Sequence, residues 1–195
     1  MSATSLLLLF LSAVLVNNFI LSRFLGICSF LGVSKKMDVA LSLGVATTFV
    51  MVLSAVITWA INEFILVPFQ LEYMTNISFI LVIASLVQLV EMFIKKTSMT
   101  LYNALGIYLP LITTNCAILG FATLAVTNAY GFIGSVVFGL GAGVGFTMAI
   151  CIMAGIREEL EYADIPKPFQ GIAITLIIAF LMSMAFLGFS GMISI

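Results

Sequence analysis

Leu109-Pro110-Leu111-Ile112-Thr113-Thr114-Asn115-Cys116 interrupts a long apolar segment with a proline, two threonines and an asparagine. Because proline has no backbone N–H and its ring clashes with the preceding helical turn, this stretch predicts a helix break. Carbonyl groups that such a break leaves free are tolerated at membrane depth only where protein or a cavity covers them. The stretch therefore predicts an interrupted helix, with Cys116 just after the interruption.

A second cysteine has a similar setting in the other half of the chain. The string Cys28-Ser29-Phe30-Leu31-Gly32 matches Cys116-Ala117-Ile118-Leu119-Gly120 at the cysteine, leucine and glycine positions. Cys28 lies in an apolar run of about 30 residues, longer than the ~20 residues that cross a bilayer. Four residues that favour an interruption lie in the middle of that run: Asn17, Asn18, Arg23 and Gly26. Both cysteines are therefore expected to follow breaks in apolar helices.

The composition is that of an integral membrane protein. Hydrophobic residues make up 63% of the chain and charged residues 8%, the mean hydropathy is +1.31, and histidine is absent. Soluble domains contain about 25% charged residues. The net charge of -1 provides no basic surface for phosphate groups, which excludes a nucleic-acid partner and leaves membrane lipid as the surroundings.

Apolar runs predict six transmembrane helices in a single membrane domain, residues 1–195. The runs lie at about 4–33, 39–61, 77–94, 99–126, 132–156 and 170–193. No Lys or Arg precedes the first run, so the basic region of a cleaved signal peptide is missing and we expect this run to remain as a span. The predicted fold class is an all-α integral membrane protein.

Basic residues predict the orientation of these helices. Under the six-helix topology, six basic side chains fall on one face of the membrane: Lys35, Lys36, Lys95, Lys96, Arg157 and Lys167. The opposite loops contain Glu63, Glu72 and polar residues but no Lys or Arg. Because basic loops stay in the cytoplasm, both termini are predicted to lie outside.

Three spans in each half indicate an inverted repeat. A second copy of an odd number of spans enters the membrane in the opposite direction, so repeat one (about 1–97) and repeat two (about 98–195) would be related by a pseudo-two-fold axis in the membrane plane. Helices one and four, the first of each repeat, are the interrupted ones. Such folds place their functional sites near the midplane on interrupted helices, which makes Cys28 and Cys116 the candidate site.

Two thiols at the centre of a helix bundle have a limited chemistry. They can pack as small apolar groups, form a disulfide or bind a metal. A structural zinc site and a [2Fe–2S] cluster each need four ligands, and a chain with three cysteines and no histidine supplies too few. A metal centre at Cys28 and Cys116 would therefore require a second chain that supplies the other two ligands.

Several stretches, spread over nearly the whole chain, resemble a known family. They are Phe24-Leu25-Gly26-Ile27-Cys28, Gly32-Val33-Ser34-Lys35-Lys36, Leu101-Tyr102-Asn103-Ala104-Leu105-Gly106-Ile107, residues 109–116, Ala154-Gly155-Ile156-Arg157-Glu158, and the shorter Asn17-Asn18 and Phe189-Ser190-Gly191. They are similar to the A-type membrane subunits of the Rnf complex and to the related E-type subunits of the sodium-pumping NADH:quinone oxidoreductase.

The resemblance implies a subunit of a translocase in the bacterial cytoplasmic membrane, not catalytic alone, that moves electrons between ferredoxin and NAD and translocates Na⁺ or H⁺. In that family this subunit and an inverted paralogue, the E-type Rnf subunit, hold a [2Fe–2S] cluster between them. Cys28 and Cys116 match the cysteines concerned, so this chain would supply half of the ligands. Flavins and further iron–sulfur clusters would belong to partner subunits of the B, C, D and G types.

A function of another class stays open. The same interrupted helices would suit a small inverted-repeat secondary transporter or channel without a redox centre, in which side-chain oxygens bind an ion or solute. The residues concerned are Asn17, Asn18, Thr113, Thr114 and Asn115. Visible absorbance separates the two hypotheses, because a subunit with a cluster is brown and a transporter is colourless.

Three ionisable residues lie outside the cysteine motifs. Cys151 has no counterpart in the other half and is interpreted as a packed thiol. Arg23 is a charge inside an apolar run, which either faces protein or water at a functional position or extends to the membrane surface. Glu91 either pairs with Lys95 one turn later or binds an ion.

Two further segments have a structural and a functional interpretation. Gly139, Gly141, Gly143 and Gly145 have the spacing of close helix packing, and they do not fit the Gly-x-Gly-x-x-Gly pattern of a nucleotide-binding loop. Residues 157–164 are interpreted as a solvated cytoplasmic loop, with docking of a soluble partner as the functional alternative.

Overall fold

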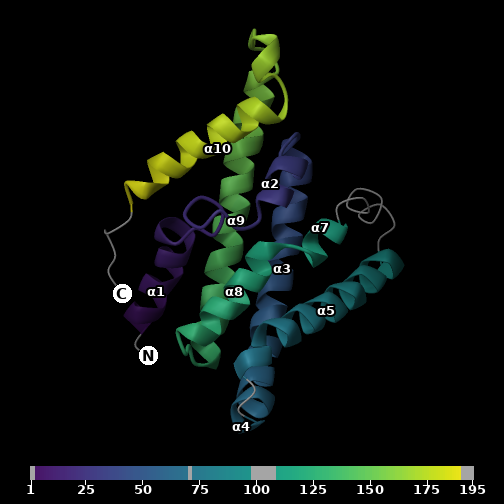
Figure 1. Cartoon of the computed structure of the whole chain (residues 1–195), viewed down its shortest axis with the longest axis vertical. Coiled ribbons are helices and arrows are strands. Elements are labelled where there is room, and N and C mark those ends of the chain that lie inside the picture. Colours follow the sequence, from purple (N-terminus) through teal and green to yellow (C-terminus); the bar gives the residue numbers. More distant parts are fainter. Residues whose placement is uncertain (1–2, 70–71, 98–108, 190–195) are drawn as a thin grey trace.

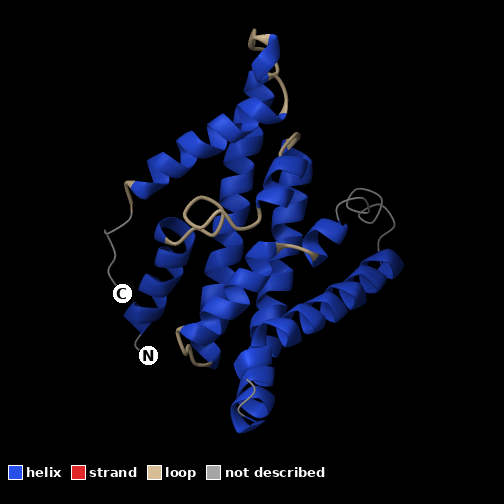
Figure 2. Cartoon of the chain, in the orientation of Figure 1, coloured by secondary structure: helices blue, strands red, loops and turns tan. Residues whose placement is uncertain are grey.

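The regular structure of this protein is helical throughout the residues that the computed structural model describes, which are 3–69, 72–97 and 109–189 (Figures 1 and 2). In chain order the α-helices are α1 (Ala3–Leu11), α2 (Ile27–Val33), α3 (Met37–Ile61), α4 (Val67–Phe69), α5 (Thr75–Thr97), α7 (Leu109–Thr113), α8 (Cys116–Thr127), α9 (Phe132–Leu160) and α10 (Ile172–Leu187). The π-helical segments η1 (Ser12–Val16) and η2 (Asn62–Leu66) extend α1 and α3. Short 3-10 turns lie at Glu72–Met74 and Lys167–Phe169.

Four helical stretches in the described part of the chain are long and apolar enough to cross a membrane. They are Met37–Leu66, Thr75–Phe93, Pro110–Thr127 and Phe132–Leu160. They match expected spans two to five, although residues 99–108 of span four, with the family stretch 101–107, lie outside the described residues. The multi-pass, all-helical class predicted from the sequence is confirmed for the described residues.

The first and sixth expected spans are shorter helices. The run 4–33 is divided into the apolar helix Thr4–Val16, an irregular segment and the seven-residue α2. The run 170–193 contains α10, whose 16 residues extend about 24 Å against a hydrocarbon layer of ~30 Å. The last residues of that run, 190–193, lie outside the described residues.

The two longest helices, α3 and α9, form the central pair of the bundle (Figure 1). Gly44 of α3 lies against Thr147, and Gly143 of α9 lies against Thr48, so that a methyl group on either glycine would fall 2.6 or 2.7 Å from the opposing side chain. The hydroxyls of Thr48 and Thr147 lie 3.2 Å apart and share a hydrogen bond. Small residues permit this close approach, which matters because lipid gives no hydrophobic driving force between helices.

The alternating glycines of α9 face two different neighbours. Gly139 and Gly143 face α3, whereas Gly141 and Gly145 face α1 and η1, where a Cβ would lie 2.8 Å from Ala13 Cβ and 3.0 Å from the Val14 carbonyl oxygen, respectively. The whole stretch is inside α9. The interpretation of these glycines as close-packing residues is confirmed.

The C-terminal end of α9 holds the turn between α2 and α3. Arg157 Nη1 donates hydrogen bonds to the Leu31 carbonyl at 3.0 Å and to Ser34 Oγ at 2.9 Å. Glu158 Oε1 accepts a hydrogen bond from the backbone N–H of Met37 at 2.8 Å. The expectation of a solvated loop was wrong for these residues, because α9 continues to Leu160 and places both side chains over the neighbouring helix ends.

Substitution of Gly143 tests the central packing. We expect Gly143→Ala to destabilise the protein by about 1–3 kcal/mol, the usual cost of overpacking, because the new methyl group would lie 2.8 Å from the backbone Cα of Thr48, which no rotamer change relieves. Gly155→Ala is the matched control on the same helix, since its Cβ would lie 3.5 Å from Met37 Cε, an ordinary contact. Thermal unfolding in detergent, followed by Trp59 fluorescence, measures both. An equal fall in the two unfolding midpoints would contradict this account of the packing.

Candidate functional site

The first interruption is the irregular segment of residues 17–26, and Asn18 holds it in place. The Asn18 side chain is fully buried. Its Nδ2 donates to the carbonyl of Gly145 at 2.8 Å and to that of Val14 at 3.2 Å. Its Oδ1 accepts from the backbone N–H groups of Ile20 and Leu21 at 3.1 and 3.4 Å. The break predicted in this run is present, and Asn18 provides hydrogen-bond partners for its buried backbone groups.

The first interruption ends at Gly26, which precedes α2. Gly26 has φ +87°, a left-handed conformation that glycine adopts without steric cost. A Cβ on this residue would lie 3.0 Å from the Phe146 ring, 3.2 Å from Ala117 Cβ and 3.2 Å from Asn115 Oδ1. Both the backbone conformation and the lack of space therefore require glycine here.

The second interruption separates α7 from α8 at Thr114 and Asn115. Asn115 caps α8, because its Oδ1 accepts a hydrogen bond from the backbone N–H of Ala117 at 3.0 Å. Cys116 is the first residue of α8. The break predicted from Pro110 is present, and it falls four residues after the proline, which lies inside the short α7.

The two interruptions contact each other. The backbone N–H of Gly26 donates a hydrogen bond to Cys116 Sγ at 2.8 Å, across 90 residues of sequence. Cys28 is the second residue of α2, two positions after Gly26. Because consecutive Cα atoms are about 3.8 Å apart, the Cα atoms of Cys28 and Gly26 are at most ~7.6 Å apart. The fold thus brings the two repeated Cys-x-x-Leu-Gly strings together.

Both thiols of this pair are exposed at the surface of the chain. Cys28 and Cys116 are free cysteines and are exposed, although cysteine is among the most buried residue types. Each lies in the first turn of a helix, where backbone N–H groups and the helix dipole favour anionic ligand atoms. Among the described residues, no group of three or more His, Cys, Asp or Glu side chains could bind a metal. The pair is therefore at most half of a four-ligand site.

The other ionisable residues singled out in the sequence lie apart from this pair or beside it. Cys151 is half-buried on α9 and packs against the hydrophobic core, which agrees with its interpretation as a packed thiol. Arg23 is exposed on the first interruption, three residues before Gly26. Glu91 is half-buried on α5, one turn before Lys95, and its two interpretations stay open.

Four of the five polar residues considered for direct ion binding, Asn17, Asn18, Thr114 and Asn115, form hydrogen bonds within the interruptions or next to them. The amide oxygens of Asn18 and Asn115 both accept backbone N–H groups. Asn17 is exposed and its Nδ2 donates to Ser12 Oγ at 3.2 Å, while the Thr114 hydroxyl donates to the Pro110 carbonyl at 2.9 Å. These side chains therefore provide hydrogen-bond partners for polar groups within and next to the interruptions.

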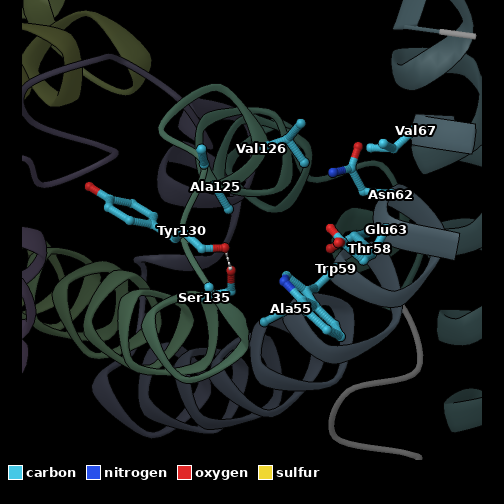
Figure 3. A pocket seen from close by; sticks show the side chains of 12 residues that line it. Ala55, Thr58, Trp59, Asn62, Glu63, Val67, Ala125, Val126, Tyr130 and Ser135 are labelled. Atoms are coloured by element: carbon cyan, nitrogen blue, oxygen red, sulfur yellow. Dashed lines mark hydrogen bonds between the residues drawn. The ribbon is translucent and has the colours of Figure 1, made fainter. Parts of the chain in front are cut away.

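A cavity of about 370 Å³ lies where α3 continues into η2, near the end of α8 and the start of α9 (Figure 3). Polar residues among its lining are Thr58, Asn62, Glu63, Tyr130 and Ser135. The Ser135 hydroxyl donates to the Tyr130 carbonyl at 3.3 Å, the dashed line in Figure 3. Neither Cys28 nor Cys116 lines this cavity. No sequence pattern predicts this cavity, because its residues come from separate elements and follow no motif.

The fold and the site together define a class: a multi-pass helical membrane protein in which two interrupted helices present a pair of exposed cysteines. A family model described as Rnf-Nqr subunit, membrane protein, matches residues 6–193. The chain belongs to this Rnf-Nqr family of membrane subunits.

Relatives at high identity cover almost the full chain. The A-type subunit of the Na⁺-translocating ferredoxin:NAD⁺ oxidoreductase complex of Acetobacterium woodii is 57% identical over 188 residues, which is 96% of this chain and 98% of the relative. The A-type subunit of the ion-translocating oxidoreductase complex of Serratia proteamaculans is 56% identical over 190 residues, 97% of this chain and 98% of the relative. The corresponding protein of Thioalkalivibrio sulfidiphilus is 55% identical, with 97% and 99% covered.

Cross-linking tests the approach of the two cysteines. In a Cys151→Ser chain, a short bismaleimide is expected to join Cys28 to Cys116 within one molecule, detected by intact mass and digestion. Gly26→Ala should lower the yield several-fold, because the added Cβ forces the two interruptions apart. Gly32→Ala is the control, since its Cβ would lie an ordinary 3.8 Å from Leu111. Equal yields from the two alanine variants would contradict the contact at Gly26.

Proposed function

We propose that this chain is a membrane subunit of an ion-translocating ferredoxin:NAD oxidoreductase complex, and that Cys28 and Cys116 provide half of the ligands of a [2Fe–2S] cluster. The observation that carries the proposal is the contact between the two interruptions, in which the Gly26 N–H donates to Cys116 Sγ. The names of the relatives, which are A-type subunits of ion-translocating oxidoreductase complexes, support the assignment to a translocase. The chain is not catalytic alone under this proposal.

The donor set fits a group that two chains share. A [2Fe–2S] cluster takes four thiolates, and this chain offers two that are free and exposed. Thiols that served only for packing would be buried, as Cys151 partly is. A paralogous subunit of the E type, in the opposite orientation, would supply the other two ligands. Flavins and further iron–sulfur clusters would be held by the B-, C-, D- and G-type subunits.

Residues of this chain then have separate roles around the cluster. When bound, the cluster supplies one-electron transfer. Cys28 and Cys116 bind iron, and the Gly26 N–H positions the Cys116 sulfur, since a hydrogen bond to a ligand atom orients the ligand and tunes the metal centre. Asn18 holds the first interruption against α9, and Arg157 anchors the far end of α2. These hydrogen bonds fix the positions of the two segments that carry the sulfur ligands.

We further propose that the six apolar runs cross the bacterial cytoplasmic membrane as an inverted repeat with both termini outside. The order of elements supports this, since each half has an interrupted helix, a long helix and a third helix. The long helices of the two halves, α3 and α9, pair at the centre. Lys35, Lys36 and Arg157 line one groove at one end of this pair, as a common cytoplasmic face requires. The coupling ion is Na⁺ or H⁺.

A transporter without a redox centre is the weaker alternative. It requires the asparagine and threonine oxygens of the interruptions to be free for an ion or solute. The Asn18 and Asn115 oxygens already accept backbone N–H groups, and a ligand would have to displace these bonds. The exposed thiol pair would have no part in such a function.

Iron content and low-temperature EPR of the dithionite-reduced complex test the proposal. In the purified complex, Cys28→Ser and Cys116→Ser are each expected to remove one [2Fe–2S] signal and about two iron atoms, because each cluster contains two irons. Cys151→Ser is the matched control and should keep both signal and iron, since that thiol packs against the core. Visible absorbance of the complex should fall in parallel.

Two results would contradict the proposal. If all three serine variants retained the wild-type spectrum and iron, the cluster would not be bound by Cys28 and Cys116, and the transporter alternative would take its place. If Cys151→Ser lost the same signal, the ligand pair would be assigned wrongly.

A further inference from the structure

We infer that Asn115 is a positioning residue whose side-chain amide donates a hydrogen bond to a sulfur atom of the cluster site and thereby raises the cluster's reduction potential. The inference rests on the proposed function, since it requires a cluster at Cys28 and Cys116. Asn115 would bind no iron itself, but it would influence electron transfer by setting the cluster's reduction potential.

The Asn115 amide has an unused donor. The residue is 3% exposed, and its Nδ2 is buried without a hydrogen-bond partner among the described residues. The other half of the amide fixes which atom this is, because Oδ1 accepts the backbone N–H of Ala117 at 3.0 Å and must therefore be the oxygen. A buried donor without a partner is unfavourable, so such a group is rare unless something else in the assembled protein accepts its hydrogen bond.

Comparison with Asn18 shows that this unused donor is not needed to hold an interruption. Both asparagines accept a backbone N–H two residues later through Oδ1. Asn18 also uses its Nδ2 fully, with bonds to the Val14 and Gly145 carbonyls. Asn115 performs the same capping with its oxygen alone. Serine or aspartate would cap α8 about as well, so capping alone does not explain an amide at this position.

The position of the Asn115 amide points to sulfur as the missing acceptor. Asn115 directly precedes Cys116, and its Oδ1 lies 3.2 Å from where a Cβ on Gly26 would be. The Gly26 N–H itself donates to Cys116 Sγ. The planar carboxamide therefore lies at the junction of the two cysteine-bearing half-helices. Because this chain already covers Nδ2, the acceptor that it would reach in the loaded site is the sulfur of Cys116, the next residue, rather than an atom outside the chain.

A donor at this junction changes the balance between the two oxidation states. The reduced cluster carries one more electron than the oxidised cluster, so a hydrogen bond to sulfur stabilises the reduced state more. Hydrogen bonds to sulfur are one of the means by which proteins set the potential of such clusters. Asn115 is thus expected to make this cluster easier to reduce than it would be with the Gly26 donor alone.

Redox titration followed by EPR on the purified complex tests the inference. Asn115→Gly removes the amide without adding a charge, and glycine is tolerated at a helix N-cap almost as well as asparagine. Asn115→Asp keeps the capping oxygen but removes the donor and adds a negative charge. We expect both variants to retain the cluster and to have a lower midpoint potential, with the larger shift in the aspartate variant.

The control is Ser54→Ala on α3. Ser54 Oγ is the other buried side-chain polar atom without a partner among the described residues, and it lies on a different element from both cysteines. This variant should have the wild-type potential. A simple capping role for Asn115 would alter stability and leave the potential of the glycine variant unchanged.

Several results would overturn the inference. An unchanged potential in Asn115→Gly does so even if Asn115→Asp shifts, because the shift then comes from charge alone. An equal shift in Ser54→Ala does so, because the effect is then general. Loss of the cluster in both Asn115 variants, with the chain still assembled, assigns the residue to cluster binding and overturns a role in tuning. Failure of the proposed function is seen separately, as a wild-type complex without a signal that depends on Cys28 and Cys116.

Discussion

The structure depends on one constraint: backbone polar groups that leave a helix in the buried interior must find partners within the protein. Asn18 meets this constraint for the first interruption with hydrogen bonds on both sides of its amide. The Ser183 hydroxyl of α10 adds another, to the Leu21 carbonyl at 2.6 Å. The interruption can therefore leave helical geometry while these groups stay paired. This freedom lets the chain bring Cys28 near Cys116.

Close packing on α9 makes these partners available. Because Gly145 has no side chain, the Asn18 amide can reach the Gly145 carbonyl. A Cβ on Gly145 would lie only 3.0 Å from the Val14 carbonyl oxygen. On another face of the same helix, Gly139 and Gly143 pack against α3. At its end, Arg157 and Glu158 bond to the end of α2 and the start of α3. One helix thus positions both the interruption that precedes Cys28 and the half-helix that contains it.

Two unusual features occur close together at the candidate site: exposed thiols and a buried hydrogen-bond donor without a partner among the described residues. Two thiols are exposed although cysteine is usually buried, and one amide donor is buried although nothing in the described residues accepts its hydrogen bond. The unpaired donor costs stability in the isolated chain, and both it and the thiols lie within a few residues of the Gly26–Cys116 contact. Under the proposed function, the cluster would provide a role for the thiols and an acceptor for the donor at the same time. Burial by lipid alone would satisfy neither.

The sequence by itself determined the membrane class, the helical breaks and the close-packing glycines, and it singled out Cys28 and Cys116 as a candidate pair. Each follows from composition or from a local pattern such as Pro110 or the repeated Cys-x-x-Leu-Gly string. It misjudged Arg157 and Glu158, whose partners on α2 and α3 lie more than 120 residues away. Only the tertiary structure decided that Gly26 contacts Cys116, that both thiols are exposed and that the Asn115 donor has no partner among the described residues. These are properties of residues distant in the sequence, and local patterns carry no information about which of them meet when α3 and α9 pack together.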